Sequence, residues 1–166
     1  MEWVIGRTGV PDFTQMARKF SSDLCHRMRL DQRLSREREP EPDPETAWRY
    51  CQAYFDETDD SMFGTVCRAS FESRLREQFS HGPISSADED PAWYALRHVV
   101  YATGCRYLLS KEDRPGAFAE AYEGGWKFFQ NALSVHTDLL FVNTSLLAVQ
   151  ALAAMVNLPS LGRSRL

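Results

Sequence analysis

The chain has 166 residues, of which 43% are hydrophobic and 25% are charged, and its formal net charge is −4. This size and composition are typical of one soluble globular domain with its own core, and no apolar run approaches the ~18 residues that a membrane span needs. The acidic balance argues against broad nucleic-acid binding by this chain, because phosphate contacts require a basic surface.

The four cysteines give no sign of a metal site. They are Cys25, Cys51, Cys67 and Cys105, and they form no CxxC pair and have no histidine at ligand spacing, whereas structural zinc sites usually show close ligand pairs. The start of the chain also lacks the basic and apolar regions of a secretory signal. We therefore expect an intracellular protein with reduced, mostly buried thiols and no cofactor in this chain.

Residues 1–43 are expected to form an irregular segment, a basic helix and a stiff linker. Glycine and proline interrupt residues 1–15, and residues 16–38 combine a thin apolar stripe with many arginines. Such a helix could contact nucleic acid or a membrane surface, but a solvated helix face is favoured because interleaved aromatic residues are absent and acidic residues follow. Residues 39–44 (EPEPDP) predict an extended linker.

Two helices are predicted in the next part of the chain. Asp43 has the character of an N-cap with Pro44 at the first helical position, and one face of this helix carries Ala47, Trp48, Cys51, Tyr54 and Phe55. The acidic residues 56–60 lack the ligand pattern of a calcium loop and predict a solvated turn, and residues 61–67 predict a loop. Residues 69–79 predict a second helix, and residues 81–90 a polar linker.

Three apolar helices are predicted in residues 91–158. Asp90 caps the first, which runs to about Leu109, and residues 111–116 form a charged loop. The second runs from Ala117 to about His136 and contains Gly124 and Gly125, a pair that indicates a close helix approach or a bend. The third is capped by Asn143 or Thr144 and closed by Pro159; from Leu146 to Met155 it is apolar nearly all round, so neighbours must bury it.

No catalytic motif is present. The sequence has no GxSxG, HExxH, GxxxxGK[ST] or GxGxxG pattern. His98 and His136 lie in helical segments, and Asp138 lies two residues beyond His136, a spacing that does not place both side chains on one helical face. Both histidines are therefore expected to be surface or helix-end residues. We predict no catalytic, metal-binding or DNA-binding residue, and no enzyme activity.

Several short motifs resemble the regulatory "middle homology" domain of fungal zinc-cluster transcription factors. They lie in residues 92–97 (AWYALR), 100–106 (VYATGCR), 126–133 (WKFFQNAL) and 145–152 (SLLAVQAL). Upstream, residues 54–63 and 68–71 are similar to the Tyr-Phe-x-x-x-x-Pro-x-Phe and Arg-Pro-x-Phe patterns of this family, with Ser61 and Ala69 in place of the prolines. The resemblance covers residues 44–158.

The resemblance implies an all-α, irregular helical bundle of about five to six helices, and a nuclear protein. The six-cysteine cluster of the family, which binds two zinc ions and reads DNA, has no counterpart here. Family members also continue with further helices, whereas residues 159–166 form a tail unlike the family. We therefore expect residues 44–158 to be an incomplete regulatory domain, and any DNA binding to reside in a domain absent from this chain.

Three functions remain open. The first is a fragment of a fungal transcription regulator, in which the apolar helix from Leu146 to Met155 packs on a protein partner or on a missing part of its own domain, with self-association as another outcome. The second is a stand-alone helical protein-interaction module. The third is a helical small-molecule-binding protein with an apolar pocket lined by Trp93, Tyr94, Tyr101 and Phe129.

Overall fold

The computed structural model describes residues 37–81, 89–142 and 145–157. The chain divides into two compact units, Met1–Arg33 and Leu34–Leu166, and all described residues belong to the second. The predicted irregular segment 1–15, most of the predicted helix 16–38, the caps Asn143 and Thr144, and Pro159 lie outside the described residues.

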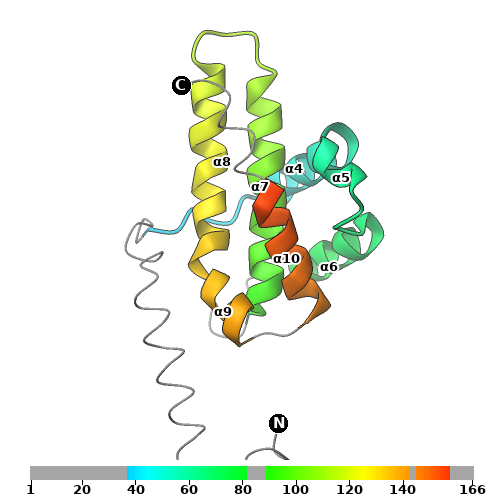
Figure 1. The fold of residues 1–166 in the computed structure, drawn as a ribbon. Coiled ribbons are helices and arrows are strands. Elements are labelled where there is room, and N and C mark those ends of the chain that lie inside the picture. The colour runs from blue at the N-terminus through cyan, green and yellow to red at the C-terminus, as the bar shows by residue number, and fades with distance from the viewer. Residues whose placement is uncertain (1–36, 82–88, 143–144, 158–166) are drawn as a thin grey trace, which may run out of the picture. The chain divides into compact units, whose positions relative to one another are not determined.

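All regular elements in the described ranges are helices, which confirms the predicted all-α bundle (Figure 1). Five are long and two, α5 and α9, are short. They are α4 (Pro44–Glu57), α5 (Asp59–Met62), α6 (Arg68–His81), α7 (Pro91–Ser110), α8 (Ala117–Ser134), α9 (His136–Phe141) and α10 (Leu146–Asn157).

The beginnings of three helices follow from local sequence signals. Asp43 Oδ1 accepts hydrogen bonds from the backbone N–H groups of Glu45 and Thr46, both at 3.1 Å, and Pro44 opens α4. Asp90 caps α7 in the same way, through the N–H of Ala92 at 2.9 Å. These caps confirm the predictions. At α10, Ser145 Oγ accepts from the Ala148 N–H at 3.1 Å, so Ser145 acts as a cap that the sequence analysis missed.

Two predicted segments differ from the structure. Residues 59–62, expected in a turn and a loop, form the short helix α5. The hydroxyl of Ser61 donates to the Thr58 carbonyl at 2.8 Å, and the Thr58 hydroxyl donates to the Tyr54 carbonyl at 2.7 Å, so local side chains satisfy the helix ends. The predicted helix 117–136 stops at Ser134, because Val135 leaves the helical region with ψ near 4°, and His136 then begins α9.

Helix α7 forms the centre of the described unit. It packs against α4, α8 and α10 (Figure 1), and nearly every residue from Ala92 to Cys105 is buried. The sequence analysis expected burial on all sides for the helix from Leu146 to Met155 instead. In the structure α10 buries one face, with Ala148, Ala151, Ala154 and Met155, against the rest of the bundle, and its other face is exposed.

Glycines let the neighbouring helices approach α7 closely. A Cβ atom added at Gly104 would lie 2.0 Å from the Tyr50 carbonyl oxygen of α4, and one added at Gly125 of α8 would lie 2.9 Å from the Ala102 carbonyl oxygen. Both obstacles are backbone atoms, which cannot move aside without shifting a helix. The structure therefore confirms the close approach that the Gly124–Gly125 pair predicted, and adds Gly104, which was not anticipated.

We expect Gly104→Ala to lower the free energy of unfolding by more than about 3 kcal/mol, because α4 must move away from α7. Urea unfolding followed by circular dichroism measures this loss. Gly124→Ala is the matched control. Its Cβ would meet only side-chain atoms of Cys105 and Leu109, at 3.2 and 3.3 Å, and alanine has the higher helix propensity, so we expect a change within about 1 kcal/mol. Equal effects of the two substitutions would contradict this account.

Candidate functional site

A buried arginine on α7 organises the polar interior. Arg97 is 1% exposed. Its Nη1 donates to Gln78 Oε1 at 2.5 Å and to Glu89 Oε1 at 2.6 Å, and its Nη2 donates to Glu41 Oε2 at 2.9 Å. Its Nε lies 2.8 Å from Glu41 Oε1 but is not aligned to donate to it. One guanidinium thus joins three segments that are distant in the sequence.

The ionic partners keep this arginine charged inside the protein. Burial by itself opposes the charge, but the nearby carboxylates of Glu41 and Glu89 outweigh it and raise the pKa of Arg97. The hydroxyl of Tyr101 also donates to Glu41 Oε1 at 3.0 Å. Burial and then the Glu41 charge raise the pKa of Tyr101, so this tyrosine stays protonated and acts as a donor. We refer to Arg97, Glu41, Glu89, Gln78 and Tyr101 as the Arg97 network.

The segment before α4 is fixed across α7 and α8. The Glu39 N–H donates to Asn131 Oδ1 at 3.0 Å, and Asn131 Nδ2 donates back to the Glu39 carbonyl at 2.8 Å. The guanidinium of Arg38 lies over the ring of Tyr94, 5.4 Å from its centroid. Together with Glu41, these contacts hold residues 38–41, the first part of the acidic, proline-rich stretch, against the bundle. We call residues 38–41 the strap.

His98 is a buried neighbour of the Arg97 network, so the expectation of a surface or helix-end residue was wrong for this histidine. Its Nδ1 lies 2.8 Å from the Tyr94 carbonyl oxygen, which can only accept, so Nδ1 carries the hydrogen. Its Nε2 lies 3.7 Å from Glu41 Oε2. Burial, followed by the Arg97 charge, lowers the pKa of His98 to about 3. A neutral, buried imidazole of this kind packs and orients its neighbours.

His136 lies where the sequence analysis placed it, at a helix end. It is the first residue of α9 and is partly buried. Burial lowers its pKa from the ordinary value.

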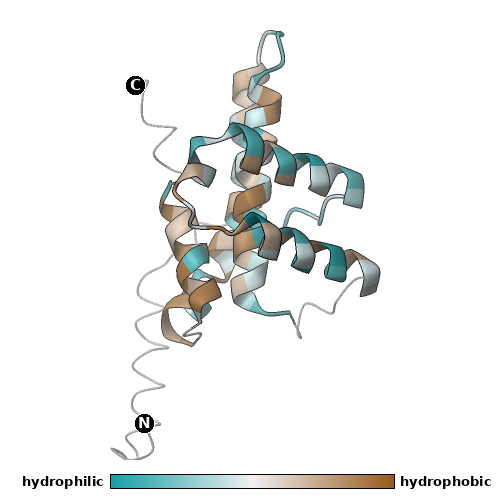
Figure 2. Ribbon diagram, turned by 90° about the vertical axis from the view of Figure 1, so that its right-hand side faces the viewer, coloured by the Kyte–Doolittle hydropathy of each residue, from teal (hydrophilic) through white to brown (hydrophobic). Residues whose placement is uncertain are grey.

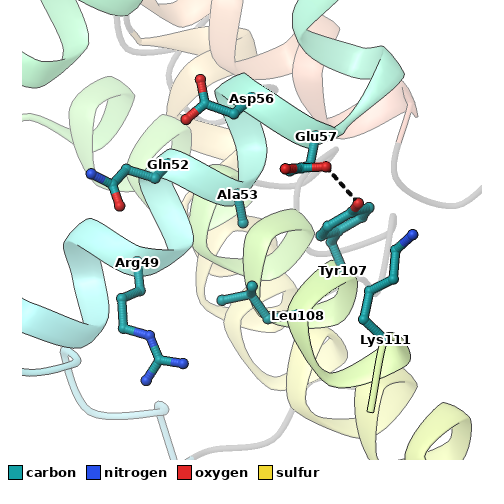
Figure 3. A pocket seen from close by; sticks show the side chains of 8 residues that line it. All are labelled: Arg49, Gln52, Ala53, Asp56, Glu57, Tyr107, Leu108 and Lys111. Carbon is teal, nitrogen blue, oxygen red and sulfur yellow. Dashed lines mark hydrogen bonds between the residues drawn. The ribbon is translucent and has the colours of Figure 1, made fainter. Parts of the chain in front are cut away.

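An open hollow lies between α4 and the end of α7 (Figure 3). Its volume is about 500 Å³, and it is lined by Arg49, Gln52, Ala53, Asp56, Glu57, Tyr107, Leu108 and Lys111. The hydroxyl of Tyr107 donates to Glu57 Oε2 at 2.8 Å, and Lys111 Nζ lies 5.0 Å from the centroid of the same ring. These contacts hold Tyr107 between Glu57 and Lys111 on one side of the hollow.

The residues expected to line an apolar pocket pack against other aromatic rings. Trp93 and Phe71 have ring centroids 5.0 Å apart, and Tyr101 and Phe128 have centroids 6.0 Å apart. Phe129 packs against Trp126 with centroids at 5.6 Å, and the ring of Tyr94 lies beside that of His98 at 4.1 Å. The four side chains proposed to line a pocket therefore take part in aromatic packing contacts, and other residues line the hollow between α4 and α7.

The cysteines of the described ranges are free thiols. Cys51 and Cys105 are buried, and burial is the main cause that raises their pKa values, that of Cys51 to about 12. Cys67 is exposed, and hydrogen bonds with Ser70 lower its pKa. Cys25 lies outside the described residues. Among the residues that the structure describes, no three potential ligands gather as a metal site would require.

Two helices expose apolar faces. On α10, Leu146, Val149 and Val156 are 77%, 61% and 74% exposed, and Figure 2 shows α10 as an almost uniformly hydrophobic helix. On α8, Phe118, Tyr122 and Trp126 follow one another at four-residue spacing and are all exposed. The row on α10 lies on a helix without ionisable side chains, and such a row indicates a surface for another protein. None of the helices within the described ranges is both long and apolar enough to cross a bilayer.

Comparison with known proteins points to transcriptional regulation. The chain is 31% identical over 116 residues to an ABC-transporter-regulating transcription factor of Aspergillus oryzae, and 30% identical over 116 residues to the protein of the same description from Aspergillus fumigatus. The chain is similar to fungal transcription factors. Each alignment covers 70% of this chain but 12% of the relative, so the chain spans about an eighth of the length of these curated relatives.

The other two comparisons add no further relative. No family model matches the chain, and no solved structure matches it. The two relatives are transcription factors and not enzymes, which agrees with the absence of catalytic motifs from the sequence.

We expect Arg97→Met to lower the free energy of unfolding by about 3–5 kcal/mol, because the carboxylates of Glu41 and Glu89 lose their buried partner. Chemical denaturation at neutral pH measures this loss, and Glu41→Gln provides a milder test of the same network. Arg114→Met is the control. Arg114 pairs with Glu112 and Glu120 on the surface, where solvent screens the charges, so little change is expected. The network would be unimportant if Arg97→Met were as mild as this control.

We expect His98 to make stability fall as the pH falls. Its folded pKa of about 3 lies below the ordinary value of 6.5, so the unfolded chain binds a proton first. The stability that the neutral His98 contributes is fully present above pH 6.5. It decreases as the pH falls from 6.5 towards 3, by up to about 1.4 kcal/mol per pH unit. NMR of the imidazole signals measures it directly: the His98 signal, assigned with His98→Gln, should not titrate between about pH 5 and pH 8. A His98 midpoint near 6.5 would refute the burial argument.

Proposed function

We propose that this chain is part of the regulatory region of a fungal transcription regulator and acts in the nucleus through protein contacts. The observation that carries this proposal is the 31% identity over 116 residues with the regulator from Aspergillus oryzae. The motifs that resemble the middle homology domain lie in the helices α7, α8 and α10, and they support the regulatory region as the part concerned. The relatives are named for regulating ABC transporters, so control of transporter genes is the first role to test.

The chemistry of the chain supports a role other than reading DNA. The net charge is −4, and four cysteines cannot supply the six-cysteine array that binds two zinc ions in the zinc-cluster family. DNA recognition by a regulator of this kind would therefore reside in a domain outside these 166 residues. The described helices offer exposed apolar surfaces, which are typical of contacts with other proteins.

Helix α10 is the part of the chain for which we propose a docking role. Its buried face fixes it on α7, and the exposed side chains of Leu146, Val149 and Val156 remain available. A protein partner, or another part of the same regulatory domain, would bury them. A stand-alone interaction module would use the same face. The small-molecule alternative has no such support, because its expected lining residues are packed against their neighbours.

A reporter assay tests this function. The full chain is fused to a heterologous DNA-binding domain and expressed in Aspergillus with a reporter gene under the matching operator. We expect reporter expression to change several-fold relative to the DNA-binding domain alone, and we expect Val149→Glu, at a 61% exposed position of α10, to abolish the change. Phe118→Glu on α8, also exposed, is the matched control and should preserve the change.

A binding assay with purified protein completes the test. Fluorescence anisotropy with labelled promoter DNA should give no sequence preference and no affinity tighter than the ~10⁻⁶ M limit of non-specific binding. A reporter that does not respond to the fusion, or specific DNA binding by the chain itself, would contradict the proposal.

A further inference from the structure

The exposed face of α10 is a continuous apolar seam. Leu146, Val149, Ala153 and Val156 are all exposed, and they follow one another at spacings of three, four and three residues. This spacing places them in one row along one side of the helix, as the a and d positions do in a pair of packed helices. Such a row is stable in water when a second helix covers it.

Charge indicates what kind of helix can cover the seam. The twelve residues of α10 include no ionisable side chain, so an acidic or basic partner helix would find no countercharge there. A two-fold axis, in contrast, brings the same surface of two copies together. Because the seam carries no charges, no like charges of the two copies repel each other there. The exposed aromatic row of α8 differs, because Glu120 and Glu123 lie on the same helix.

We propose that α10 pairs with α10 of a second copy of this chain, antiparallel, about a two-fold axis near Ala153. This inference deepens the docking role proposed for α10 and rests on that proposal. Ala153 lies between Val149 and Val156 in the row, and its small side chain allows the two helix axes to approach. The antiparallel pairing places Val149 of one copy against Val156 of the other. It also sets the positive end of each helix dipole beside the negative end of its partner.

The size of the seam sets the expected affinity. One face of a twelve-residue helix is smaller than the ~800 Å² that each partner contributes to a standard interface. Leu140 and Val142 are also exposed, at and just after α9, which contacts α10. We therefore expect a weak, reversible dimer, as is typical of interfaces below the standard size.

Sedimentation of the purified full chain, from about 1 to about 200 µM, tests the dimer across the affinity range expected for this interface. The mass should rise from that of the 19.0 kDa chain to twice that value. Val149→Glu and Val156→Lys should each stay monomeric, with unchanged helical circular dichroism because both positions are exposed. Phe118→Glu on α8 is the matched control and should dimerise like the wild type.

Mixing the two monomeric variants, Val149→Glu and Val156→Lys, tests the arrangement. In the antiparallel pair the introduced glutamate of one chain would face the introduced lysine of the other, while the second contact remains Val156 against Val149. The mixture should therefore recover a dimer that neither variant forms alone. A wild-type monomer at all concentrations, a dimer that survives both substitutions, or a mixture that stays monomeric would each overturn the proposal. The reporter assay is independent: a monomeric chain that still regulates would refute the dimer alone.

Discussion

The guanidinium of Arg97 is the constraint around which the described unit is built. A charge on a helix that is buried on nearly every side is tolerated only when partners surround it. Those partners come from Glu41 before α4, Gln78 in α6 and Glu89 just before α7. We expect the buried charge, with its three oxygen partners, to favour this register over others that apolar packing alone would accept. Hydrophobic burial supplies the driving force, and the Arg97 network specifies the arrangement.

Close backbone contact is the second constraint and acts on the same helix. At Gly104 the absence of a side chain lets the Tyr50 carbonyl of α4 lie against α7, and at Gly125 it lets α8 approach the Ala102 carbonyl. The rings of Tyr50, Tyr101 and Phe128 then pack at steep angles, with centroids between 5.8 and 6.4 Å apart. Helix positions fixed to this degree leave little freedom inside the bundle. The docking role that we propose accordingly uses an outward face, that of α10.

The sequence predicted the features that depend on neighbouring residues. The caps at Asp43 and Asp90, the proline that follows each cap, and the apolar face of α4 are local signals, and all are found in the structure. Contacts between distant residues could not be read in the same way. Glu41 and Arg97 are 56 positions apart, and nothing near His98 indicates that the Arg97 network covers it. The burial of α7 rather than α10 also depends on tertiary placement, because both helices are mostly apolar.

In the candidate site, too, local features could be predicted from the sequence and contacts between distant residues could not. The exposed apolar row on α10 follows from its composition, which made this helix the expected contact surface. Of the four aromatic residues expected around a pocket, Trp93, Tyr101 and Phe129 are core residues and Tyr94 is half-buried, since a helical pattern does not distinguish a lined cavity from a filled interior. The hollow between α4 and α7 could not be anticipated, because its lining combines residues from two helices.

The strap also determines when folding can be completed. Its bond partner Asn131 follows Glu39 by 92 positions, so during synthesis the strap leaves the ribosome long before α8 exists. Until α8 has been synthesised, the backbone of Glu39 remains hydrated, because its hydrogen-bond partner, the side-chain amide of Asn131, is missing. The native arrangement is therefore reached only after most of the chain has been translated, and a nascent chain that stalls before α8 would lack the contact that fixes Glu41 beside Arg97.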